Sequence, residues 1–135
     1  MRVLALDVGD KRVGVAISDP TQMLARSLKV IQRSSPENDC DTVAQLVEEY
    51  EVERVVVGYP RSLDGTVGEQ AEKVERYAAG LAKALDVPVV LWDERFSTVS
   101  AERLMREVGL RGKKKRERID AVAAAVILQD YLDSR

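Results

Sequence analysis

Residues 2–18, RVLALDVGDKRVGVAIS, contain two apolar runs that are separated by a short polar segment. The run Arg2–Asp7 is short and apolar, which is typical of a buried strand that ends in a carboxylate. A polar turn with Gly9 follows, and Arg12–Ser18 is rich in β-branched residues that alternate with small ones. This pattern predicts an antiparallel hairpin at the start of the chain.

Beyond the hairpin, strands and helices alternate. The expected elements are a strand Leu28–Gln32, a helix from Ser34–Pro36 with Asn38 or Asp39 near its cap, a strand Arg54–Gly58, a loop Tyr59–Gly68, a helix Glu69–Leu85, a strand Val87–Trp92, a helix Ser97–Val108 and a helix Ile119–Leu132. This order predicts an α/β fold, with a mixed five-stranded sheet led by an antiparallel hairpin and helices on both faces. A chain of 135 residues fits one domain, residues 1–135.

The composition excludes several kinds of chemistry. The chain has no histidine, which removes Ser-His-Asp catalysis and histidine metal sites. It has one cysteine, Cys40, so it has neither an internal disulfide nor a thiolate zinc site. No apolar run approaches the ~20 residues of a membrane span, and the first residues lack the pattern of a secretory leader. We therefore expect a cytoplasmic protein with no membrane partner.

The charge is unevenly distributed along the chain. The formal net charge is −2, but residues 111–118, RGKKKRER, carry six basic residues and one acidic residue, or +5. The remainder is therefore at −7. We predict a basic loop that either is simply solvated or contacts phosphates.

Acidic residues occur where predicted strands end or a helix begins. They are Asp7, Glu94 with Asp93 beside it, and Asp120. Each residue alone also fits a cap, a turn or a salt bridge. Together, close carboxylates repel one another unless a cation lies among them. A hard divalent ion with oxygen ligands, Mg²⁺ or Mn²⁺, would meet that need.

Four segments resemble the YqgF/RuvX family of nucleases, which has a ribonuclease-H-like (RNase H-like) fold. They are DVGDKRVGVAISD (7–19), GYPRSLDG (58–65), DERFST (93–98) and IDAVAAAVILQDYL (119–132). The resemblance implies a catalytic and metal-binding triad of Asp7, Glu94 and Asp120, which would hold two Mg²⁺ or Mn²⁺ ions. Asp93 remains the alternative to Glu94. Strand alternation puts the two on opposite faces, so only one of them can face Asp7, and the family motif favours Glu94.

The resemblance also implies a role and a set of partners. It predicts a metal-dependent nuclease, a hydrolase that processes the 16S rRNA precursor in ribosome biogenesis, with branched DNA as the alternative substrate. We expect a monomer or a homodimer, and no organic cofactor. The expected nucleic-acid-binding residues are Lys11, Arg12, Arg61, Arg95, Lys113, Lys114, Lys115 and Arg118.

Two other classes of protein compete with the nuclease. The Asp7-Val8-Gly9 segment also matches the first phosphate motif of actin-like kinases, but those enzymes close two such domains around ATP. A ribosome-assembly factor that binds RNA without cutting it is the second competitor. It would bind RNA equally well without divalent metal.

Overall fold

The computed structural model describes residues 1–60, 68–93 and 112–135, and in the last of these ranges it describes side chains from residue 121 onward. The strands form one five-stranded sheet. The strands are β1 (Arg2–Val8), β2 (Arg12–Ser18), β3 (Ala25–Gln32), β4 (Val52–Tyr59) and β5 (Val89–Asp93). Their order across the sheet is β3-β2-β1-β4-β5, with β1 in the centre. The hairpin strands pair antiparallel, whereas β4 and β5 run parallel to β1. The predicted mixed sheet is confirmed.

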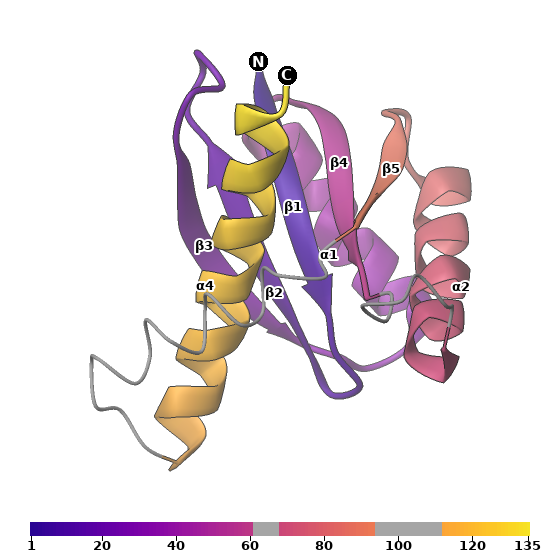
Figure 1. Cartoon of the computed structure of the whole chain (residues 1–135). Helices are drawn as coiled ribbons and strands as arrows, with labels where there is room; N and C mark the ends of the chain where they lie inside the picture. Colours follow the sequence, from indigo (N-terminus) through magenta and orange to yellow (C-terminus); the bar gives the residue numbers. More distant parts are fainter. Residues whose placement is uncertain (61–67, 94–111) are drawn as a thin grey trace.

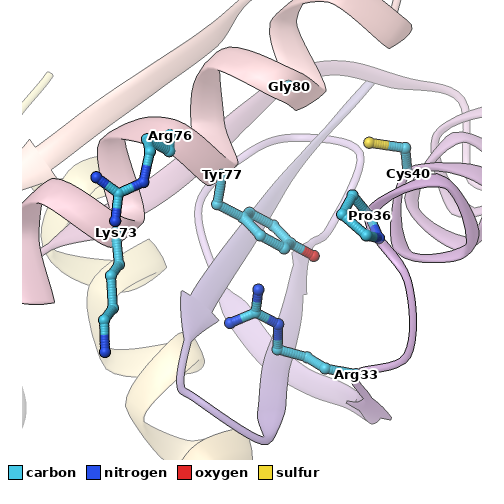
Figure 2. Close-up of a pocket in the computed structure, with 7 residues that line it drawn as sticks. All are labelled: Arg33, Pro36, Cys40, Lys73, Arg76, Tyr77 and Gly80. Carbon is cyan, nitrogen blue, oxygen red and sulfur yellow. The ribbon is translucent and has the colours of Figure 1, made fainter.

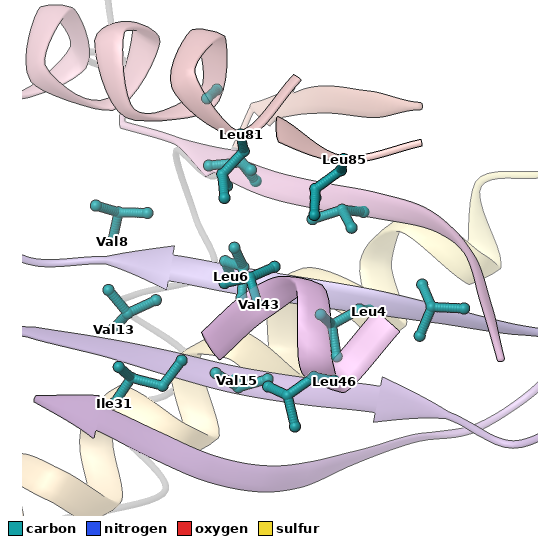
Figure 3. Close-up of a cluster of buried hydrophobic side chains, with 14 of the residues drawn as sticks. Leu4, Leu6, Val8, Val13, Val15, Ile31, Val43, Leu46, Leu81 and Leu85 are labelled. Carbon is teal, nitrogen blue, oxygen red and sulfur yellow. The ribbon is translucent and has the colours of Figure 1, made fainter. Parts of the chain in front are cut away.

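Helices cover both faces of the sheet (Figure 1). The helices α1 (Pro36–Glu49) and α2 (Glu69–Ala84) pack on one face, and α4 (Gly112–Asp133) lies across the other. The first core lies between the sheet and the α1/α2 layer, where Leu4, Leu6 and Val15 meet Val43 and Leu81 (Figure 3).

The second core lies beneath α4, and several of the residues on its sheet side are small. Val3, Ala5 and Ala16 on the sheet meet Ala124 and Ile127 on the helix. Small side chains let a helix approach a sheet closely, so α4 lies tightly on β1 and β2. The face of β1 that carries Val3 and Ala5 is called the α4 face below.

Three strands have boundaries that differ from the predicted ones: β4 begins at Val52 rather than Arg54, and β5 begins at Val89 rather than Val87. Strand β3 begins at Ala25, not Leu28, because Ala25, Arg26 and Ser27 find partners on β2.

Helix α1 begins at Pro36, inside the predicted start, and its cap is Ser35, whose hydroxyl accepts a hydrogen bond from the Asn38 N–H at 3.1 Å. Asp39 lies near the cap as predicted and accepts from the Ser34 N–H at 3.2 Å. Pro36 then occupies the first turn, where its missing N–H costs nothing.

The prediction of a basic loop before the last helix is wrong. Helix α4 begins at Gly112 rather than Ile119, so the basic residues of that stretch lie within the helix: Lys113, Lys114, Lys115, Arg116 and Arg118. The physical reason is that lysine, arginine and glutamate are good helix formers and that no glycine or proline interrupts residues 113–133. The predicted helix Ser97–Val108 lies outside the described residues, as does most of the loop Tyr59–Gly68.

Among the helices that the structure describes, none combines the length and the apolar character that crossing a bilayer requires.

Candidate active site

Asp7 lies near the carboxyl end of the central strand β1 and is half-buried. Side chains alternate along a strand, so Asp7 shares the α4 face with Val3 and Ala5. The sheet thus places one carboxylate at its centre, on the side covered by α4.

Glycines flank Asp7 on both neighbouring strands. Gly14 on β2 is the direct cross-strand partner of Asp7. Gly58 on β4 follows Val57, the partner of Leu6, and so comes next in register beside Asp7. On the α4 face, therefore, neither adjacent strand places a side chain next to Asp7. This arrangement leaves room at the carboxylate for a ligand such as a metal ion or a phosphate.

Asp93 lies on the other face of the sheet. On β5, Val90 and Trp92 pack against the core beneath α4, whereas Val89 packs against the core beneath α1 and α2. Asp93 continues the alternation of Val89 and so shares the face of α1 and α2. Of the two acidic residues in the DERFST motif, Asp93 does not face the side of Asp7. Glu94 lies outside the described residues.

Helix α4 carries Asp120 toward the same end of the sheet as Asp7. Near the C-terminus of the helix, the Tyr131 hydroxyl accepts a hydrogen bond from Arg54, which lies beside Val3 at the start of β1. About three turns earlier, the Ala121 carbonyl accepts from Ser27, which is level with Ala16 and Ala5. The helix thus runs antiparallel to β1, as Figure 1 shows, and Asp120 follows in the direction of Asp7.

The hairpin turn after Asp7 is closely held. The Gly9 N–H donates to the Arg12 carbonyl at 2.8 Å, and a Cβ atom on Gly9 would lie 2.9 Å from that oxygen. Arg33 donates to the Gly9 carbonyl at 2.8 Å, and Gln70 donates to the Val8 carbonyl at 3.3 Å. Sequence reasoning missed Arg33 and Gln70, because only the packing of distant segments brings them to the turn.

The predicted phosphate-contacting residues are only partly described. Arg12 lies two positions before Gly14 on β2, so it shares the α4 face with Asp7, and Lys11 is exposed at the turn. Arg61 and Arg95 lie outside the described residues. For Lys113, Lys114, Lys115 and Arg118, the structure describes only their place in the first turns of α4.

Of the three predicted metal ligands, Asp7 is the one whose side chain the structure describes. Among residues 1–60, 68–93 and 121–135, no three acidic or cysteine side chains gather into a possible metal site. The carboxylate oxygens of the predicted triad are the ligands that hard divalent ions prefer, and the neighbours of Asp7 on β2 and β4 are glycines.

Comparisons with known proteins identify a matching family and similar proteins. The family model "RuvX: Holliday junction resolvase" matches residues 1–134. A protein of Desulforamulus reducens is 48% identical over 134 residues, covering 99% of this chain and 98% of its own length. One of Halothermothrix orenii is 48% identical over 133 residues, covering 98% and 95%. Both relatives are named "Putative pre-16S rRNA nuclease".

Solved structures agree on the fold. RuvC of Thermus thermophilus in complex with a Holliday junction superposes with a TM-score of 0.60 at 21% identity, covering 100% of this chain and 95% of that chain. The fowlpox virus resolvase with junction DNA gives a TM-score of 0.57 at 16% identity, covering 99% and 98%. The whole-chain family match and the two relatives at 48% identity therefore establish that this chain belongs to the RuvX family and is a nuclease, a hydrolase of phosphodiester bonds.

Proposed function

We propose that this protein, a single domain over residues 1–135, cleaves RNA with the help of divalent metal and processes the 16S rRNA precursor. The observation that carries the proposal is the setting of Asp7, a carboxylate at the centre of the sheet with a glycine on each side. The names of the relatives support the choice of substrate.

The proposed ligands for the ions are Asp7, Glu94 and Asp120. Two Mg²⁺ or Mn²⁺ ions bound there would supply Lewis acidity toward the scissile phosphate and lower the pKa of the attacking water. Asp7 comes from the rigid centre of the sheet, and Asp120 comes from a helix packed across it. Histidine takes no part, because the chain has none.

The cations have a separate role in the proposal. Arg12 shares the α4 face with Asp7, and it would bind the phosphate backbone near the site of cleavage. Lys11, Arg61, Arg95 and the basic residues of α4 would extend that contact along the nucleic acid. Contacts of this kind position a strand without reading its sequence.

The decisive variant is Asp7→Asn, which keeps the size of the side chain and removes its charge. We expect cleavage of a precursor RNA fragment in Mg²⁺ or Mn²⁺ to fall more than ~100-fold, because a direct metal ligand should matter more than a second-layer one. The melting temperature and the RNA affinity should remain near those of the wild-type protein. Undiminished turnover in this variant would remove Asp7 from the site.

Asp93→Asn is the matched control, since it makes the same chemical change on the opposite face of the sheet. We expect it to retain wild-type cleavage, whereas Glu94→Gln and Asp120→Asn should behave like Asp7→Asn. If Asp93→Asn loses activity and Glu94→Gln keeps it, the second ligand is Asp93 rather than Glu94.

The same assay separates the competing functions. Symmetric cutting of a four-way DNA junction, with no cutting of the RNA, would favour a resolvase, as the name of the family model indicates. A resolvase needs two active sites, so sedimentation should then show a dimer. Binding of RNA without cutting, equally with and without metal, would favour an assembly factor.

A further inference from the structure

A hollow opens between α1 and α2 (Figure 2). It lies on the face of the sheet that these two helices cover, whereas Asp7 lies on the α4 face. Its volume is about 290 Å³. The residues that line it are Arg33, Pro36, Cys40, Lys73, Arg76, Tyr77 and Gly80. The volume is near the lower end of small-molecule sites, which suits a ligand the size of one nucleotide.

The three cations that line the hollow differ in how closely an acidic residue balances their charge. Arg33 lies 3.6 Å from the buried carboxylate of Asp39, which balances its charge. Lys73 lies 3.6 Å from Asp10 and 3.9 Å from Glu69, and both of those partners are exposed to solvent. Such exposed pairs are weak, so Lys73 is available to an anion.

Arg76 adds a second available cation. It lines the hollow, and no ion pair joins it to an acidic residue in the described ranges. It comes from the same helix as Lys73, one position before Tyr77. The guanidinium group offers several donors in a fixed plane and suits the oxygens of a phosphate.

Tyr77 contributes an unused hydrogen-bond donor. Its hydroxyl is buried and finds no hydrogen-bond partner among the described residues. Figure 2 shows the ring in the middle of the hollow, and the guanidinium of Arg33 lies 5.1 Å from its centroid. Burial raises the pKa of this hydroxyl, so it keeps its proton at neutral pH. A buried donor without an acceptor costs free energy, and a ligand oxygen would remove that cost.

Cys40 forms part of the wall, and at a given pH less of its thiol is ionised than in an ordinary cysteine. Burial raises the pKa of its thiol, and the neighbouring acidic residues Asp39, Asp41 and Glu37 raise it further. The thiol and Pro36 therefore add an uncharged side to a site whose other groups are cations and a phenol.

We propose that this hollow binds a phosphate monoester carried by a nucleotide. Lys73 and Arg76 would bind the phosphate, and the Tyr77 hydroxyl would donate to a ligand oxygen. A free mononucleotide and the 5′-phosphorylated end of an RNA chain offer this same chemistry. The site is separate from the proposed catalytic site, because the sheet lies between the two.

The first test is calorimetric titration with inorganic phosphate, AMP and adenosine. We expect AMP to bind, and adenosine to bind at least about tenfold more weakly, because it lacks the charged group. The double variant Lys73→Gln/Arg76→Gln should lose at least about tenfold in AMP affinity. Lys83→Gln removes a charge from the same helix outside the hollow, and it should bind AMP as the wild type does.

The Tyr77→Phe variant tests the unused donor. It removes only the oxygen, which has no described partner, so the melting temperature should stay the same or rise. The affinity for AMP should nevertheless fall about threefold or more, which a purely structural tyrosine would not produce. Unchanged affinity would remove Tyr77 from the site.

The only cysteine of the chain reports on the location of the ligand. Cys40 lines the hollow, so bound AMP should slow its alkylation by iodoacetamide, and this protection should disappear in the double variant. A free mononucleotide is excluded as the ligand if neither phosphate nor AMP binds, or if they bind and leave the alkylation rate unchanged. The 5′-phosphorylated end of an RNA is then the remaining candidate.

A pair of RNA oligonucleotides, one with a 5′-phosphate and one with a 5′-hydroxyl, decides between the two sources. The Asp7→Asn variant carries this test, so the RNA stays intact. Protection of Cys40 by the phosphorylated RNA alone identifies an RNA end as the ligand. Equal protection by both RNAs, or protection by no ligand at all, overturns the proposal. Because these are binding readouts, they stand even if the protein cleaves nothing.

Discussion

Gly9 illustrates how a single missing side chain shapes the hairpin next to Asp7. Its N–H and the Arg12 carbonyl close the turn at 2.8 Å, and there is no space there for a Cβ atom. The neighbouring atom is backbone, which cannot swing aside as a flexible side chain would. Glycine is therefore required at this position by packing rather than by chain flexibility.

Replacing glycine by alanine should consequently have opposite effects at two places. Gly9→Ala should cost about 1–3 kcal/mol of stability, because the turn must distort. Gly80→Ala should stabilise by about 0.5–1 kcal/mol, since Gly80 lies inside α2 with open space around it. Urea denaturation of both variants measures the two changes. Equal effects would show that the close approach at Gly9 is unimportant.

At the scale of elements, the turn between β2 and β3 depends on one carboxylate. Asp19 accepts hydrogen bonds from the N–H groups of Met23 and Leu24, both at 2.9 Å, and from Thr21. These hydrogen bonds hold the pKa of Asp19 well below its ordinary value of 3.8, and the bond from the Leu24 N–H has the largest effect. The turn is therefore most stable when Asp19 is ionised.

The sign of the pH dependence follows from that lowered pKa. A carboxyl whose pKa falls on folding contributes stability above its unfolded pKa, and that contribution is lost as the pH falls toward the folded value. Asp19→Ala should therefore destabilise the protein most at neutral pH, and the difference from the wild type should narrow below about pH 4. Urea midpoints at pH 7 and pH 3 measure it. A difference that is constant with pH would contradict this account.

Helix α4 shows how one element serves two ends of the molecule. Its C-terminal half packs on the sheet, where Tyr131 receives a hydrogen bond from Arg54 and stacks edge-on with Trp92 at 5.5 Å. Its N-terminal turns include Asp120 and the basic residues of the 113–118 stretch. The helix thus joins a stable core to a charged segment that we assign to nucleic-acid binding.

At the scale of the whole molecule, the separation of charge governs the encounter with a polyanion. The basic stretch 111–118 carries +5, whereas the other residues together carry −7. An acidic body repels phosphate, so association should proceed through the basic stretch. Because this stretch lies just before Asp120 in the chain, we expect it to direct the nucleic acid toward the proposed catalytic site.

Neutralising Lys113, Lys114 and Lys115 together to glutamine should weaken RNA binding and flatten its dependence on salt. Each lost phosphate contact lowers the slope of log affinity against log salt by about 0.7–0.9. Lys29→Gln with Lys83→Gln is the control, because both lysines are exposed and far from this stretch in sequence. Binding measured at several salt concentrations gives the slopes. A slope that the triple variant shares with the wild type would make these lysines bystanders.

The sequence alone determined the hairpin, the mixed sheet, the helices on its two faces and the family, because hydrophobic periodicity and local motifs carry that information. It also singled out Asp7, since a carboxylate that ends a buried strand is unusual. Side-chain alternation is a local rule, and it already predicts that Asp93 and Glu94 lie on opposite faces of the strand. The start of α4 at Gly112 does not follow from periodicity, because residues 113–118 are charged and carry no apolar repeat, although lysine, arginine and glutamate favour a helix.

The surroundings of these residues depend on how distant segments of the chain pack together. The glycines beside Asp7 come from strands that lie seven and about fifty residues away in the chain, and only the register aligns them. Arg33 reaches the Gly9 carbonyl because β3 returns beside the hairpin. The hollow at Tyr77 exists because α1 and α2 pack side by side. Such neighbours depend on contacts between distant segments, which periodicity in one segment does not encode.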